Sequence, residues 1–250
     1  RSINGVDFVL PFRFSEGAWQ LGTRGPISLR IAEVVNQVTV KNIAADLQGA
    51  YPWSENNPLL LSDVSADLLG GKIIMQQLRM PQHDPALLRV QNISSSELIS
   101  AVNPKQFAMS GPVSGALPLW LDNEKWIIKD GWLTNPGPMT LRIDKDTADA
   151  VVKDNMAAGA AINWLRYMEI SHSWTKINLD NLGVLTMQST VTGNSRVDGK
   201  VGTVNLNYTH EENVFTLWRS LRFGDNLQAW LEQNAALPET HCPEGKECEI

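Results

Sequence analysis

The sequence predicts a mainly β fold with a few packed helices, in which repeated hairpins form a curved, twisted antiparallel sheet or groove. Three observations favour this fold class. Apolar and polar residues alternate through many segments, turns rich in Gly, Asn and Pro separate those segments, and one short motif occurs twice. A period of two places the apolar residues of a strand on one face of the sheet. That face must be covered by helix, by another sheet or by a ligand, and the nature of the cover decides the function.

The repeated motif is GPISLRI at residues 25–31 and GPMTLRI at residues 137–143, with five identical residues out of seven. Each copy follows a Gly, a Trp and a Leu in close order, with Trp19 before the first copy and Trp132 before the second. We interpret the copies as one supersecondary unit used more than once. The alternative is a chance resemblance between two hairpins.

The N-terminal part of the chain predicts a series of strands. Five apolar residues from Val6 to Phe14 alternate strictly with other residues, which is typical of a half-buried strand. A Pro- and Asn-rich segment at 51–58 predicts a loop, and Gly70-Gly71 predicts the turn of a hairpin. The predicted strands in this part cover residues 3–14, 27–33, 37–48, 59–69, 72–80 and 87–93.

A short helix is predicted after these strands. Ser94 and Glu97 have the spacing of a capping box, in which Ser94 accepts from the amide three residues on and Glu97 reaches back. Leu98, Ile99 and Val102 give the helix one apolar side, and a Pro at position 104 ends it.

The stretch 109–143 predicts three further strands. Asp122–Glu124, Asp130-Gly131 and the Pro-rich segment 135–138 supply the turns between them. The apolar residues that alternate along these strands form the candidate binding rows. They are Leu117, Leu119, Leu121, Trp126, Ile128, Met139, Leu141 and Ile143.

The C-terminal part changes character twice. Ala-rich residues 145–168 and amphipathic residues 213–234 predict helices that pack on the sheet. Strands are predicted at 173–179, 184–192 and 200–210, and a short Cys-containing tail follows at 235–250. No internal linker marks a domain boundary, so we expect residues 1–250 to form one β-groove region.

Composition excludes several classes of protein. A formal charge of −6 argues against a nucleic-acid partner, which requires a basic patch. No run of about eighteen apolar residues occurs, so we expect no transmembrane segment in this chain. The chain opens without Met or a signal peptide, which predicts a fragment of a longer protein whose targeting segment lies upstream.

Two cysteines, Cys242 and Cys248, lie together in a loop that contains Pro and Gly. We expect a disulfide that closes a small loop in an oxidising compartment. Half of a zinc site with His241, or free surface thiols, are the alternatives.

The sequence indicates neither an enzyme nor a cofactor. Its four histidines have no metal-ligand spacing, and the common nucleophile, phosphate-loop and dinucleotide motifs are missing. We therefore predict no catalytic residues, no metal and no cofactor, and expect a binding or scaffold protein. Nine tryptophans keep a second class open, a module that binds cell-wall or lipopolysaccharide carbohydrate through exposed Trp.

Four segments together resemble the AsmA-like envelope proteins, and most closely the C-terminal part of the YdbH family. They are DVSADLLGG at 63–71, SGPVSGALPL at 110–119, WIIKDG at 126–131 and GPMTLRI at 137–143. The resemblance implies a long protein of the Gram-negative periplasm, anchored in the inner membrane upstream of this chain. It implies a curved β-groove that carries phospholipid between the inner and outer membranes. It also implies a small outer-membrane lipoprotein partner that joins by adding strands near the C-terminal end.

Two structures are compatible with the candidate rows. If the resemblance extends to function, Leu117, Leu119, Leu121, Trp126, Ile128, Met139, Leu141 and Ile143 line a concave face that holds acyl chains. In the alternative, the same residues belong to a closed core in which they meet the side chains of the predicted helices.

Overall fold

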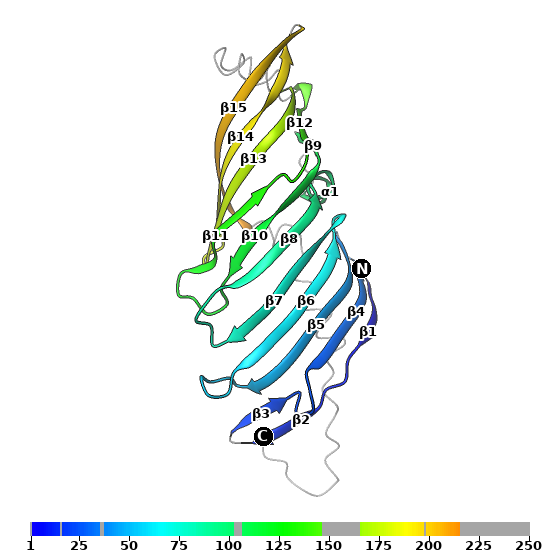
Figure 1. Cartoon of the computed structure of the whole chain (residues 1–250), viewed down its shortest axis with the longest axis vertical. Helices are drawn as coiled ribbons and strands as arrows, with labels where there is room; N and C mark the ends of the chain where they lie inside the picture. The colour runs from blue at the N-terminus through cyan, green and yellow to red at the C-terminus, as the bar shows by residue number, and fades with distance from the viewer. Residues whose placement is uncertain are drawn as a thin grey trace, which may run out of the picture.

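We describe the fold from a computed structural model, which covers residues 2–15, 17–35, 38–102, 107–146, 166–197 and 199–215. This part of the chain contains fifteen strands and one complete helix (Figure 1). The strands up to the helix are β1 (Ser2–Asp7), β2 (Phe12–Ser15), β3 (Ala18–Leu21), β4 (Ile27–Val35), β5 (Thr39–Tyr51), β6 (Leu59–Leu68), β7 (Gly71–Met80) and β8 (Ala86–Ser94). After helix α1 (Ser95–Val102) come β9 (Phe107–Ser110), β10 (Pro112–Leu119), β11 (Trp126–Thr134), β12 (Met139–Ile143), β13 (Tyr167–Asp180), β14 (Val184–Val197) and β15 (Lys200–Asn213).

All fifteen strands belong to one sheet, and all of its strand pairs are antiparallel. The strand order along the main path is β1-β4-β5-β6-β7-β8-β10-β11-β13-β12-β9. Figure 1 shows an elongated, curled layer, in which the strands run obliquely across the long axis of the molecule. The predicted fold class, a curved antiparallel sheet of repeated hairpins, is confirmed.

The sheet branches at β13. The C-terminal half of this strand pairs with β11, and its N-terminal residues pair with β12. Its other edge pairs along its length with β14, which in turn pairs with β15. Among the described strands, β15 pairs with β14 alone and β1 pairs with β4 alone, so each forms an edge of the sheet, as do the short strands β2 and β9.

Four exposed residues with positive φ interrupt the strands: Asn42 (52°), Asp63 (50°), Asn92 (52°) and Asp130 (55°). Each lies where the register between neighbouring strands shifts. Extra residues of this kind bend a strand and increase its right-handed twist. The series of bulges therefore contributes to the curl of the sheet.

Bulges explain two differences from the sequence-based expectations. Asp130-Gly131, predicted as a turn, lies inside the continuous strand β11, because the positive φ that suits a turn also suits a bulge. The single strand predicted over 3–14 is divided into β1 and β2 by residues 8–11. Pro11 lacks an amide proton for a ladder, and β2 pairs instead with β3.

The β6–β7 hairpin is confirmed, with its turn one residue earlier than predicted. Leu69 and Gly70 occupy the turn, and both have positive φ (49° and 74°), as a type I′ turn requires. Helix α1 is also confirmed. Ser94 Oγ accepts from Glu97 N (3.3 Å), but the Ser94 amide donates to the carbonyl of Leu69 (2.8 Å), not to the Glu97 side chain.

The repeated motif begins a strand at the same position in both copies, although β4 has nine residues and β12 has five. Its third residue begins a strand in each case, β4 at Ile27 and β12 at Met139, and each of these side chains is 4% exposed. The predicted helices at 145–168 and 213–234, the tail at 235–250 and both cysteines lie largely outside the described residues. Within the described part, Tyr167 and Met168 belong to β13 and Asn213 belongs to β15.

Candidate functional site: the apolar face of the sheet

One face of the sheet, which we call the apolar face, carries nearly continuous hydrophobic rows. Residues opposite one another on adjacent strands point to the same face, so the register identifies each row. One row consists of Val64, Met75, Leu88 and Leu117. A neighbouring row consists of Ala66, Ile73, Val90, Gly115, Leu133, Thr175, Ser189 and Tyr208. The second row is apolar from β6 to β11 and carries hydroxyl groups from β13 to β15.

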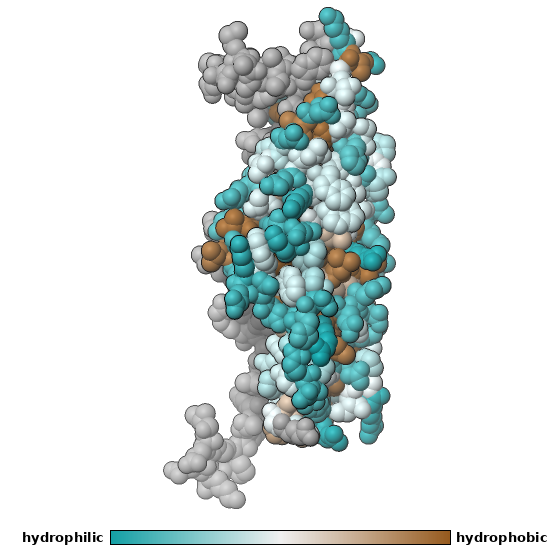
Figure 2. Space-filling model, turned by 60° about the vertical axis from the view of Figure 1, so that its left-hand side comes forward, coloured by the Kyte–Doolittle hydropathy of each residue, from teal (hydrophilic) through white to brown (hydrophobic). Residues whose placement is uncertain are grey.

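The opposite face has a different character. One of its rows consists of Arg30, Ala44, Ser65, Ile74, Arg89, Ala116, Trp132, Lys176, Gln188 and Thr209. Arg30 forms an exposed ion pair with Asp46 (3.4 Å), and Lys176 forms another with Asp130 (3.4 Å). The view in Figure 2 shows a mainly hydrophilic surface with separate hydrophobic patches. The sheet therefore has one apolar face and one mixed, largely polar face.

Two buried clusters lie on the apolar face. The first contains Met75, Leu78, Met80 and Ala86, and the partly buried residues that pack on it come from β6, β8 and β10. The second cluster consists of Met139, Met168 and Ile170, with partly buried neighbours Met109, Val113, Leu141, Val191 and Val204. Both clusters thus pack against side chains of the same sheet.

Five of the predicted lining residues lie in or beside these clusters. Leu119 packs on the first cluster and pairs with Ile128. Leu117 and Ile128 both lie over Gly131, because a Cβ built there would be 2.9 Å and 3.1 Å from their methyl carbons.

Met139 and Leu141 belong to the second cluster. Ile143, on the same strand, pairs with Phe107 of β9. The structure thus divides the predicted residues between two parts of the face, one around β10 and β11 and the other around β12.

Leu121 and Trp126 have other surroundings. Leu121 follows the end of β10 and is 58% exposed. The ring of Trp126 lies under two ammonium groups, Lys129 Nζ at 4.4 Å and Lys125 Nζ at 4.9 Å. Cation–π contacts of this kind occupy the ring face that a hydrophobic neighbour would otherwise cover.

Several apolar-face residues were not predicted. Gln76 and Gln77 interrupt the alternation of β7, which concealed that Met75 and Leu78 share a face. Met168 lay at the end of a predicted helix, although it is fully buried on β13. A search that allowed an interruption at Gln76 and Gln77 would have placed Met75 and Leu78 on one face.

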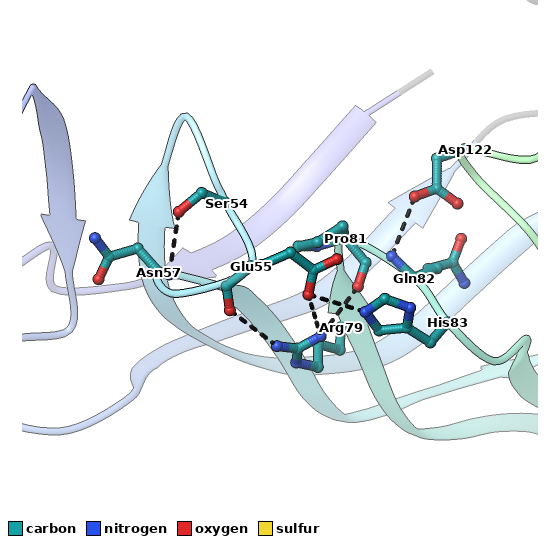
Figure 3. Close-up of polar contacts among 8 residues, drawn as sticks. All are labelled: Ser54, Glu55, Asn57, Arg79, Pro81, Gln82, His83 and Asp122. Carbon is teal, nitrogen blue, oxygen red and sulfur yellow. Dashed lines mark hydrogen bonds and ion pairs between the residues drawn. The ribbon is translucent and has the colours of Figure 1, made fainter.

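Polar contacts join the loops along one rim of the sheet (Figure 3). Glu55 Oε2 lies 2.9 Å from His83 Nε2 and 3.9 Å from Arg79 Nη1. Arg79 also donates to the carbonyls of Pro81 and Glu55, each at 3.3 Å. These contacts tie the β5–β6 loop to the β7–β8 loop.

Gln82 extends this connection to the next loop. Its side-chain amide donates to Leu119 O (3.1 Å) and accepts from Leu121 N (2.7 Å), as a paired strand residue would. Its backbone amide donates to Asp122 Oδ2 (3.1 Å). The rim beside Leu119 is therefore held by side-chain hydrogen bonds where the strands end.

The opposite ends of β5 to β8 surround a polar depression of about 740 Å³. It is lined by charges of both signs, including Lys41, Asp67 and Glu97. Asp67 is engaged by Asn42 Nδ2 (2.9 Å) and Lys72 Nζ (3.7 Å). Its lining has three acidic residues and two lysines, and it shares no residue with the two buried clusters.

The tryptophans are dispersed over the described strands and loops. Trp19 contacts Phe12 and Phe14 edge-to-face, and Trp132 stacks on Trp174 at 4.9 Å. Trp19, Trp53 and Trp174 are each at least 39% exposed. These exposed rings lie on separate elements of the structure. Their arrangement does not test carbohydrate binding, so that alternative remains a prediction.

Within the described residues, no group of three or more His, Cys, Asp or Glu is placed to hold a metal ion. In the same part of the chain, no helix is long and apolar enough to cross a bilayer.

Comparison with known proteins gives two matches. The family model YdbH-like, described as intermembrane phospholipid transport protein YdbH, matches residues 1–236. A protein of Escherichia coli (strain K12) named "Probable phospholipid transport protein YdbH" is 80% identical over 247 residues. The match covers 99% of this chain and 28% of that protein, so the chain spans less than a third of its relative. No solved structure matches the chain.

Proposed function

Because the chain belongs to the YdbH-like family, we propose that its apolar face holds phospholipid acyl chains. In this proposal the chain is one segment of a longer protein that carries phospholipid between the inner and outer membranes. The observation that carries the proposal is the set of apolar rows that continue from strand to strand across one face, such as Val64, Met75, Leu88 and Leu117. All described strands belong to the sheet that bears those rows.

The energetics favour acyl chains as the occupant. Each methylene taken out of water contributes about 0.8 kcal/mol, so burial of ten methylenes contributes roughly 8 kcal/mol. A continuous row lets a chain slide without re-entering water. The opposite, largely polar face of the sheet keeps the protein in contact with water.

The family resemblance also leads us to propose a location. The chain would lie in the periplasm of a Gram-negative bacterium, where sequence upstream anchors the longer protein in the inner membrane. An apolar groove is useful there because phospholipids must cross an aqueous compartment between two bilayers.

A partner is proposed at β15. An edge strand presents unpaired backbone amides and carbonyls, which a strand of another chain can join. β15 spans Lys200–Asn213 and, among the described strands, pairs with β14 alone. We assign this edge to a small outer-membrane lipoprotein that adds a strand, in agreement with the resemblance.

Photocrosslinking tests the lipid-binding face. Crosslinkers at Leu119 and Leu141 should give phospholipid adducts in cells, because both residues lie on the apolar face. Crosslinkers at the adjacent positions Pro118 and Arg142 are the matched controls, since strand alternation points them to the other face. Adducts are identified by mass spectrometry of the purified protein.

Two outcomes would contradict the proposal. Folded protein without adducts at Leu119 and Leu141 would indicate a closed core that excludes lipid. Equal adduct yields at these positions and at Pro118 and Arg142 would indicate nonspecific contact with membranes.

A further inference from the structure

The apolar face ends in a hydrogen-bonded polar chain on the edge strand β15. Tyr208, His210 and Glu212 are spaced by two residues, so they lie on the same face of this strand. Tyr208 Oη lies 3.1 Å from His210 Nδ1, and His210 Nε2 lies 3.0 Å from Glu212 Oε2. The Tyr208 and His210 rings are stacked, with centroids 6.0 Å apart.

The register places the side chains of Tyr208, His210 and Glu212 on the apolar face. Tyr208 is opposite Ser189, and His210 is opposite Met187. Met187 is in turn opposite the buried Ile177 of β13, which pairs with Gly131. A lipid tail lying on Met187 and Ile177 would therefore have its polar end at β15.

The hydrogen-bond pattern gives the polar chain a direction. A carboxylate only accepts hydrogen bonds, so His210 Nε2 carries the proton that faces Glu212. In the neutral imidazole, Nδ1 then accepts from the Tyr208 hydroxyl. The Tyr208 hydroxyl and the His210 Nε2–H thus both donate in the direction of Glu212. The lone pairs of Tyr208 Oη and the second carboxylate oxygen of Glu212 are left for an external donor.

The surrounding charges favour a cation. The apolar-face residues of β14 opposite this chain are Leu185, Met187 and Ser189, none of which is basic. The nearest basic side chain of that register, Lys176, lies on the other face and pairs with Asp130. Among the described residues the base beside Glu212 is His210, and in its neutral form it leaves the carboxylate charge to attract an ammonium group, to which an aromatic ring adds a cation–π contribution.

A row of hydroxyl groups begins at Tyr208, at the other end of the polar chain from the carboxylate. Thr175, Ser189 and Tyr208 are opposite one another on three adjacent strands, and Thr175 Oγ1 is 2.9 Å from Ser189 Oγ. The Tyr208 proton faces His210, and one of Thr175 and Ser189 donates to the other, so one hydroxyl proton of this row is left for a phosphate oxygen. The site thus offers acceptors for an ammonium and a donor for the phosphate that accompanies it in a zwitterionic head group.

We propose that Tyr208, His210 and Glu212 form a head-group site that selects phospholipids bearing a primary ammonium. This inference rests on the proposed lipid-binding face and specifies its preferred substrate class. Glu212 accepts from the ammonium, Tyr208 contributes its ring and hydroxyl oxygen, and His210 holds both in position.

A competition experiment tests the site. The full-length protein is incubated with vesicles that contain equal amounts of phosphatidylethanolamine and phosphatidylglycerol, and the lipids bound to the reisolated protein are quantified by mass spectrometry. The wild type should be enriched in phosphatidylethanolamine. Glu212→Gln, which keeps the size of the side chain and removes its charge, should lower the enrichment about three- to five-fold, as expected for a partly exposed ion pair.

The neighbouring carboxylate supplies a matched control. Glu211 is opposite Thr186, on the other face of β15, so Glu211→Gln makes the same chemical change away from the site. Glu211→Gln should bind phosphatidylethanolamine and phosphatidylglycerol in the same ratio as the wild type. Tyr208→Phe, which keeps the ring, should give a smaller loss than Glu212→Gln.

Each contrary result has a distinct meaning. Bound lipid in the vesicle ratio for the wild type, or equal effects of Glu211→Gln and Glu212→Gln, would overturn the head-group site while the lipid-binding face stands. Self-association of Glu212→Gln with an unchanged lipid ratio would show that the charge only protects an edge strand, and would also overturn the site. No bound lipid in the wild type would overturn the lipid-binding face and this inference with it.

Discussion

Individual residues with left-handed backbone determine where the strands bend. An L-residue at positive φ costs roughly 1–2 kcal/mol, and Asn and Asp tolerate it best because their short polar side chains can bond locally. Asn42, Asp63, Asn92 and Asp130 occupy such positions. The backbone amide of Asn92 donates to Ser114 Oγ (2.9 Å), and the backbone amide of Asp130 donates to Asn178 Oδ1 (2.8 Å). Side chains of the next strand thus satisfy amides that the shifted ladder leaves unpaired.

Asn92 provides a test of this argument. Asn92→Val should destabilise the β8–β10 pair by about 1–2 kcal/mol, because a β-branched residue is strained at a φ of 52°. Asn92→Gly also removes the amide side chain but tolerates the backbone, so it should be nearly neutral. Hydrogen exchange of β8 and β10 in the two variants measures the difference. Equal exchange rates in both would show that the side chain, and not the backbone, matters at this bulge.

At the scale of the element, glycine allows β10 to approach β11 closely. A Cβ at Gly115 would overlap the carbonyl oxygen of Trp132 and would lie 2.9 Å from Leu133 Cα. Backbone atoms cannot rotate away, so the strands would have to separate. The contact of these two strands therefore depends on a missing side chain.

Gly115→Ala should accordingly destabilise the chain by about 1–3 kcal/mol, the usual cost of overpacking. Gly137→Ala is the matched control, because its new Cβ would meet only Pro112 Cγ at 3.8 Å. The shift in thermal unfolding midpoint compares the two variants. A shift for Gly137→Ala as large as that for Gly115→Ala would mean that steric contact is not the cause.

Element type was predictable from the sequence, but bulges and pairings were not. Alternation is clear in β4, at Ile27, Leu29 and Ile31, and the Gly70-Gly71 turn signal identified the β6–β7 hairpin. The same Asp-Gly pair serves as a turn or a bulge depending on the partner strand, so Asp130-Gly131 was assigned wrongly. A bulge also changes which residues share a face. Ile128 and Leu133 lie on the same face five residues apart, which a strict period of two does not allow.

At the scale of the whole molecule, the described edge strands β15 and β1 differ in length. β15 spans Lys200–Asn213, whereas β1 spans Ser2–Asp7. The longer edge offers more backbone groups to an added strand. The site residues Leu117, Leu119 and Ile128 were predicted together because they alternate locally. The polar chain on β15 was missed, because its place on the apolar face follows from the register of strands distant in sequence.

The two edges give different predictions for a partner strand. Photocrosslinkers at Asn207 and Thr209 of β15 should yield an adduct with a small lipoprotein, and deletion of that lipoprotein should abolish it. A crosslinker at Asn4 of β1 should give no such adduct in either strain. Adducts that persist at Asn207 and Thr209 after the deletion would contradict docking of this partner at β15.

The branch at β13 has a mechanical consequence. Among the described strands, β11 and the strands that precede it on the main path are joined by hydrogen-bonded ladders to β9, β12, β14 and β15 through β13 alone. The β11–β13 register is interrupted twice, between Trp126 and Ile128 and between Ile128 and Gly131. A pulling force applied between β1 and β15 would pass in series through every ladder between them, including the β5–β6 ladder, which is interrupted twice as well. Tension across a long protein held at both ends would thus be limited by its interrupted ladders.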